Sequence, residues 1–144
     1  MKIVVEGIPM AKQSARFRIA KNKTGKDFIK SYQKKELKDN ETNSRYDIKH
    51  QLPKDFIPYA NIPLQLELTF VFPPLKSLTK TKMKQLENGE VIYKTTKPDN
   101  DNLQKNIADI LNGLVYTDDA LVSISVVKKI YGFTPRTEIV IKTL

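Results

Sequence analysis

The chain has 144 residues, with 25 basic and 16 acidic side chains and a formal net charge of +9 at pH 7. This length predicts a single domain with one core, and the positive charge favours a polyanionic partner. The absence of cysteine excludes disulfides, thiolate metal sites and cysteine nucleophiles, and the single histidine, His50, argues against triad hydrolysis. No apolar run reaches the ~20 residues that span a bilayer, and the N-terminus has no signal-peptide core. We therefore expect a cytoplasmic protein with no membrane partner.

The first sixty residues combine one short predicted strand with a polar, lysine-rich stretch. The apolar run at residues 2–5 predicts a strand, which Gly7 and Pro9 end. The spacing of two aromatic residues and a leucine predicts a helix over residues 27–38. Residues 42–54 have no readable hydrophobic period, which predicts a flexible loop.

The middle of the chain predicts a strand and then a helix. Leucine and phenylalanine alternate with mostly polar residues over 64–72, the period of a strand with one buried face. Two prolines end this strand. Thr79 is placed as the N-cap of a short helix that runs to about Glu87 and is closed by Asn88-Gly89.

The clearest helix pattern lies in the C-terminal third. Asn100 or Asp101 is suited to cap a helix that runs to about Asn112, with Gly113 just beyond its end. Apolar residues at helical spacing predict one buried face: Leu103, Ile107, Ile110, Leu111 and Leu114.

Two strands are predicted after this helix, over residues 120–130 and 137–142. The succession of strands and helices predicts one α+β domain over residues 1–144, in which helices pack on a mixed β-sheet.

Charge is distributed unevenly along the chain. Residues 1–60 and 61–98 carry net charges of +7 and +3, whereas residues 99–144 carry −1. Within that last segment five aspartates fall close together: Asp99, Asp101, Asp109, Asp118 and Asp119. Bound metal cations would relieve their mutual repulsion, although solvated caps and turns are the alternative interpretation.

The first two aspartates stand two residues apart. If residues 99–101 are extended, both carboxylates point the same way and can bind one hard cation or flank two. Lys105 lies one turn further along the helix, on the face that carries Asp101, and is placed to meet a phosphate oxygen or leaving group. Asp109 is expected to be a helix-face acid that stabilises this lysine. Oxygen ligands, Mg²⁺ and a lysine suffice in principle to hydrolyse a phosphodiester without histidine or cysteine.

Two common metal-binding motifs do not fit this segment. An EF-hand loop needs an oxygen ligand and a glycine where Leu103 and Gln104 stand. Leu103 also occupies the place of the acid in the acid-x-Lys element of a common nuclease signature.

Residues 97–119 read Lys-Pro-Asp-x-Asp-Asn-Leu-x-Lys-x-x-x-Asp-x-Leu-Asn-Gly-x-x-Tyr-x-Asp-Asp. This string closely resembles the signature of the RusA-type Holliday-junction resolvases, endodeoxyribonucleases often carried by prophages. Further motifs similar to that family lie along most of the chain: Gly7-x-Pro9-x-x-Lys12, Pro74-Leu-Lys76-Ser77, and Lys128 with Tyr131-Gly132.

The resemblance implies a set of site residues. In that family three acidic residues bind the metal and a lysine in the following helix is essential. These positions fall on Asp99, Asp101, one of the pair Asp118 and Asp119, and Lys105, and we favour Asp119 over Asp118. The implied cofactor is Mg²⁺, with Mn²⁺ as a possible substitute.

The implied activity is structure-selective hydrolysis of paired phosphodiesters in four-way DNA junctions, in recombination and repair, by a homodimer. Binding to DNA phosphates is predicted for five basic residues: Lys12, Arg16, Arg18, Lys76 and Lys97. One departure from the family pattern is Ser14, which stands where an arginine is usual.

Two other classes of function fit the basic composition. One is a catalytically inactive module that binds DNA or RNA, and the other is a subunit that docks acidic proteins through residues 1–60. Neither needs the bunched aspartates, which therefore favour the nuclease.

Overall fold

The central feature of the fold is a four-stranded mixed sheet. The computed structural model describes residues 1–13, 16–32 and 34–144. The strand order is β1 (Lys2–Glu6), β6 (Arg136–Thr143), β4 (Leu64–Phe72) and β5 (Val122–Tyr131). β4 pairs antiparallel with β6 and parallel with β5, while β1 pairs antiparallel with β6. The predicted α+β class with a mixed sheet is therefore confirmed.

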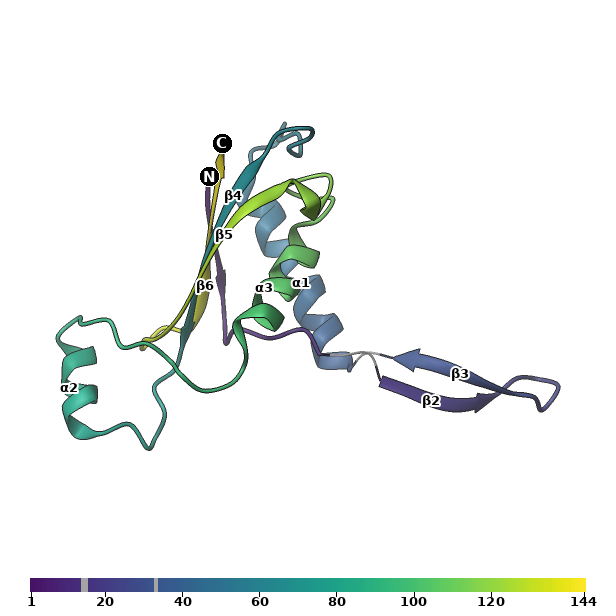
Figure 1. The fold of residues 1–144 in the computed structure, drawn as a ribbon, viewed down its shortest axis with the longest axis horizontal. Helices are drawn as coiled ribbons and strands as arrows, with labels where there is room; N and C mark the ends of the chain where they lie inside the picture. Colours follow the sequence, from purple (N-terminus) through teal and green to yellow (C-terminus); the bar gives the residue numbers. More distant parts are fainter. Residues whose placement is uncertain (14–15, 33) are drawn as a thin grey trace.

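The core lies between this sheet and two helices, α1 (Lys35–Gln51) and α3 (Asn100–Leu111). Both helices lie on the same face of the sheet (Figure 1). The alternating apolar residues of β4 point into this core and are almost fully buried, as is the apolar face of α3. The amphipathic patterns of residues 64–72 and 100–112 thus predicted their elements correctly, because burial on one face is what creates such a pattern.

Several other predicted elements are confirmed near their expected bounds. Strands β1, β5 and β6 match the predictions for residues 2–5, 120–130 and 137–142, except that a 3₁₀ turn, η1 (Asp119–Leu121), precedes β5. Helix α2 (Lys80–Glu87) begins after Thr79, whose Oγ1 accepts a hydrogen bond from the Lys82 amide at 3.3 Å. α2 lies at one end of the molecule, apart from α1 and α3 (Figure 1).

The prediction of a helix over residues 27–38 is wrong for residues 27–32, whereas residues 35–38 are the start of α1 and residue 33 lies outside the described residues. Residues 16–32 form a two-stranded antiparallel ribbon of β2 (Arg16–Lys21) and β3 (Asp27–Tyr32). Its turn is stabilised by the Asn22 side chain, which accepts bonds from the amides of Thr24 and Lys26. The ribbon is stabilised by pairs of residues across its two strands. The spacing of apolar residues within one segment could not reveal such pairs.

The prediction of a loop over residues 42–54 is wrong for residues 42–51, because α1 extends to Gln51. Its buried residues are Leu37, Ser44 and Ile48. Such a narrow buried stripe on a polar helix leaves little hydrophobic period to detect.

Ser14, the departure from the family pattern, lies outside the described residues. Among the helices of the described ranges, none combines the length and the apolar character that crossing a membrane requires.

Candidate active site

The N-terminus of α3 carries the first two predicted aspartates. Asp99 is the N-cap residue, with extended backbone angles of φ −77° and ψ 148°, and its carbonyl accepts the Leu103 amide at 3.1 Å. Its side chain makes no capping hydrogen bond, and the carboxylate is exposed, with the Lys97 ammonium 3.4 Å away. Asp101 lies in the first helical turn and is exposed. Both negative charges stand at the end of the helix that favours anions.

The extended arrangement considered for residues 99–101 does not form, because the helix already begins at Asn100. Pro98 restricts the backbone of the residue before it and leaves the residues after it free to turn into a helix. Asp99 and Asp101 therefore leave the backbone at a helix start rather than from one side of a strand.

Lys105 projects from α3 one turn beyond Asp101 and is exposed. At 100° per residue the two side chains lie on nearly the same line along the helix. Its ammonium group makes no hydrogen bond or ion pair within the described ranges. The expected pairing with Asp109 is wrong, because the Asp109 carboxylate forms an ion pair with Lys12 instead.

The second pair of aspartates follows α3. Asp118 uses its carboxylate to cap η1, accepting the Ala120 amide at 2.8 Å. Asp119 is the first residue of η1 and is exposed. Burial raises the pKa of the nearby Tyr116 phenol, and the negative charges of Asp119 and Asp109 raise it further. The Tyr116 hydroxyl donates to the Ala108 carbonyl at 3.1 Å, so the segment that leads into Asp119 lies beside the second half of α3.

Asp119 therefore lies well along the helix from Asp101. Seven residues separate Asp101 from Ala108, which is ~10 Å of helix rise. Throughout residues 1–13, 16–32 and 34–144, no three His, Cys, Asp or Glu side chains come together as a metal-binding group. The donor set has the oxygen chemistry that Mg²⁺ prefers, but the structure does not gather a third carboxylate with Asp99 and Asp101.

Strand β5 runs back along α3 and completes an open strip. The Gln104 side chain donates to Ser125 Oγ at 2.9 Å, which joins the helix to the strand. We call this surface the α3–β5 strip; its exposed charged residues include Asp99, Asp101, Lys105 and Asp119. It presents acids at both ends and a lysine between them.

Comparison with known proteins identifies the family. The model for endodeoxyribonuclease RusA matches residues 6–142. The chain belongs to the RusA family. The match spans the signature at 97–119 and every other motif that suggested the resemblance, so that prediction is confirmed.

One curated relative matches part of this RusA-family chain. The uncharacterized protein YqaN of Bacillus subtilis (strain 168) is 38% identical over 82 residues, which are 56% of this chain and 57% of YqaN. The matched region thus spans little more than half of that relative's length.

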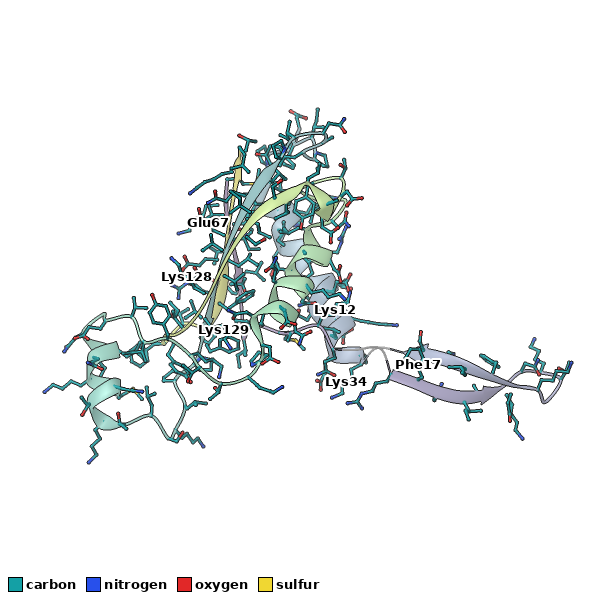
Figure 2. The ribbon with its side chains drawn as sticks, viewed as in Figure 1. Lys12, Phe17, Lys34, Glu67, Lys128 and Lys129 are labelled. Carbon is teal, nitrogen blue, oxygen red and sulfur yellow. The ribbon has the colours of Figure 1, made fainter. Side chains whose placement is uncertain are left out.

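A lysine that sequence reasoning missed holds the segment before Asp99 in this family member. Lys129, on β5, donates from Nζ to the carbonyls of Thr96 at 2.9 Å and Pro98 at 2.7 Å. Figure 2 labels it beside the start of α3. The neighbouring Lys128 belongs to a family motif, whereas the partners of Lys129 are backbone atoms about thirty residues earlier. No sequence pattern could have indicated them.

Lys94 anchors the same segment from within the core. It is 8% exposed, its amide donates to the Lys129 carbonyl at 2.9 Å, and its Nζ donates to Thr96 Oγ1 at 2.5 Å. Its ammonium also lies 5.2 Å and 5.5 Å from the ring centroids of Phe72 and Tyr131, which compensates a buried positive charge. The backbone directly before Asp99 is therefore fixed to the end of the sheet.

The other side of α3 is fixed by Lys12 and Arg45. The Lys12 amide donates to the Asn102 carbonyl at 2.9 Å, and its ammonium pairs with Asp109. One Arg45 nitrogen donates to the carbonyls of Ile110 at 2.7 Å and Asn112 at 3.1 Å, which caps the helix C-terminus. The structure thus gives Lys12 a partner inside the protein, although it was predicted to bind phosphate.

The remaining predicted DNA contacts are spread over the molecule. Arg16 and Arg18 are exposed on the β2–β3 ribbon, while Lys76 is exposed between β4 and α2. The Lys97 ammonium lies 3.4 Å from an Asp99 carboxylate oxygen and remains largely exposed. The ribbon and α2 extend in opposite directions from the α3–β5 strip (Figure 1), so these residues flank the strip on both sides.

Proposed function

We propose that this chain is a Mg²⁺-dependent, structure-selective endonuclease that resolves four-way DNA junctions by paired phosphodiester hydrolysis. The observation that carries the proposal is the α3–β5 strip, in which exposed acids and Lys105 stand on a basic protein of an endodeoxyribonuclease family. Neither alternative function requires this strip.

Lys105 is the residue that we assign to the phosphate. Its ammonium is exposed and has no partner of its own within the described ranges, so it can approach a phosphate oxygen without breaking an ion pair. A positive charge held there would stabilise the charge that develops on the phosphate or the departing oxygen.

We propose that Asp99 and Asp101 bind the metal. The third ligand that the family resemblance implies is Asp119, with Asp118 as the alternative, and within the described residues it is not gathered with the first two. Asp118 already accepts a hydrogen bond from Ala120, which supports the choice of Asp119. When bound, Mg²⁺ or a substituting Mn²⁺ would polarise the phosphate and lower the pKa of a water. The chain's own contribution is to hold the Asp99 backbone through Lys129 and to leave these carboxylates exposed.

We further propose that the protein acts as a homodimer on branched DNA, in recombination and repair, in a prophage setting. Resolution of a four-way junction requires cleavage of two symmetrically placed strands. A two-fold dimer supplies one α3–β5 strip for each of these strands. Arg16, Arg18, Lys76 and Lys97 would contact phosphates on either side, so binding should weaken steeply with salt.

The test is a nicking assay on a labelled four-way junction and a linear duplex of the same sequence, with Mg²⁺, with Mn²⁺ and without metal. We expect paired nicks near the crossover in the wild type. Asp101→Asn and Lys105→Gln should each reduce cleavage by about 10² or more while junction binding persists. Asp55→Asn, an exposed acid elsewhere, is the matched control and should cleave normally.

The opposite result has a definite meaning. If the folded wild type binds junctions tightly yet cuts none with either metal, the nuclease proposal is wrong. The inactive nucleic-acid-binding module would then be the better description.

A further inference from the structure

The β2–β3 ribbon has two chemically different faces. Residues paired across antiparallel strands point to the same side, and the register pairs Phe17 with Ser31 and Ile19 with Ile29. One face therefore carries Phe17, Ile19 and Ile29, which are 68%, 76% and 73% exposed, with the pair Lys21 and Asp27 at its turn end. The register also pairs Arg18 with Lys30, and Arg16 lies on their side, so the opposite face carries a basic cluster, with Ala20 and the 45% exposed Phe28 next to the turn.

The apolar face is left uncovered by the rest of the chain. The ribbon projects from the body (Figure 1), and Figure 2 labels Phe17 on the projecting part. An isolated two-stranded ribbon is marginally stable in water, and clustered exposed apolar side chains indicate a binding surface. The apolar face of the ribbon is therefore suited to bind a partner.

The charge of the ribbon indicates what that partner is. Residues 16–32 contain six basic residues and one acid, Asp27, and lysines continue through the turn at positions 21, 23 and 26. A second copy of this chain would bring the same positive charge to the contact, whereas DNA brings the opposite charge.

We infer that the β2–β3 ribbon is an arm that grips branched DNA with a separate role for each face. The basic face binds phosphates of the duplex arms, and the apolar face packs against bases left unstacked at the branch point. This inference rests on the proposed function and extends it, since it names the element that distinguishes a junction from a linear duplex.

DNA structure gives a reason for this division of roles. Phosphates line every duplex, so basic contacts strengthen binding to linear and branched DNA alike. A two-stranded ribbon has the dimensions to enter a major groove. Base faces become accessible only where stacking is interrupted, and aromatic or apolar side chains bind them with little regard to sequence. The apolar face should therefore add affinity for the junction alone.

The experiment measures the affinity of the full chain for a labelled four-way junction and for a linear duplex, over a range of salt, in EDTA to prevent cleavage. The basic-face variant is Arg16→Gln with Lys30→Gln. We expect it to weaken binding to both DNAs and to reduce the slope of log affinity against log salt by about 2. Its control, Lys49→Gln with Lys54→Gln, removes the same charge from the far end of α1 and the loop after it and should leave the slope unchanged.

The apolar-face variant is Phe17→Ser with Ile19→Ser. We expect its affinity for the junction to fall about tenfold, the effect of losing one stacked base, while its affinity for the duplex stays within about twofold. Ile57→Ser with Val91→Ser is the control, because these side chains are 82% and 59% exposed elsewhere. Thermal unfolding of all variants should match the wild type, since the ribbon lies outside the core.

Three outcomes overturn the inference. An unchanged salt slope in the basic-face variant excludes the ribbon as a DNA arm, and equal losses on junction and duplex in the apolar-face variant exclude its selective role. A change in the sedimentation of the apolar-face variant without DNA would assign that face to a second copy. Junction cleavage by the wild type is measured separately. The nuclease proposal can therefore hold if the inference about the ribbon is wrong, and the inference about the ribbon can hold if no cleavage is observed.

Discussion

The α3–β5 strip and the β2–β3 ribbon represent two ways in which this chain places the residues of its proposed function. The strip rests on the sheet: α3 buries one face against it, Lys129 holds the backbone before Asp99, and Arg45 caps the far end of α3. The ribbon is held by its own cross-strand pairs and presents apolar side chains to water. Side chains that carry out chemistry need a fixed scaffold, whereas a projecting ribbon can meet a large ligand outside the core.

The largest expected effect is the difference in the free energy of unfolding between a core variant and a ribbon variant. Phe70→Ala removes a fully buried ring from β4 and should lower the free energy of unfolding by about 3–5 kcal/mol. Ile29→Ala, on the exposed apolar face of the ribbon, should change it by less than about 0.5 kcal/mol. Urea unfolding followed by circular dichroism measures both. A loss of several kcal/mol in Ile29→Ala would mean that the ribbon is part of the core, and the comparison would fail.

An intermediate effect is expected at Lys129, which contacts no reacting group but holds the backbone beside Asp99. Lys129→Met removes the donor from the carbonyls of Thr96 and Pro98. We expect kcat for junction cleavage to fall about 10- to 100-fold through misplacement of Asp99, while KM changes little.

The neighbouring Lys128→Met removes the same charge from β5 without touching that segment, and it should keep kcat near the wild-type value. If the two variants lose activity equally, or if both lose only DNA affinity, Lys129 acts through its charge and is not a positioning residue.

The smallest effect concerns Glu67, on β4. The hydrogen bond from Lys142 lowers its pKa, a bond from Gln65 adds to this, and partial desolvation opposes both. Because the folded-state pKa lies below the unfolded value, Glu67 adds stability above the unfolded pKa of about 4.5, and that contribution disappears as the pH falls through the folded pKa.

Unfolding of wild type and Glu67→Gln at several pH values tests this. The wild type should be slightly the more stable near neutral pH, and the difference should shrink as the pH falls below about 4.5. A difference that stays constant with pH would contradict the lowered pKa. The effect is expected to be small because exposed ion pairs contribute little.

The sequence alone determined those elements whose stability is visible in local pattern. The alternation of β4 and the apolar face of α3 are read directly because each element buries one face against a single core. Thr79 caps α2 as predicted, and Gly113, just after α3, has the positive φ of +72° that glycine tolerates best. The motif at 97–119 likewise indicated the family before any coordinates, since its spacing reflects one helix and the turn that follows it.

Only the tertiary structure decided the features that depend on residues far apart in the chain. The ribbon needed the pairing of β2 with β3, and α1 needed the sheet beneath its narrow buried stripe. The ion pair of Lys12 with Asp109 joins residues 97 positions apart, and the hydrogen bond from Lys129 to the Pro98 carbonyl joins residues 31 positions apart. Such contacts leave no local periodicity, because their energy arises when the folded sheet and helices bring the partners together. The sequence therefore named the acids and the lysine of the candidate site, and the fold decided which of them stand together and what holds them.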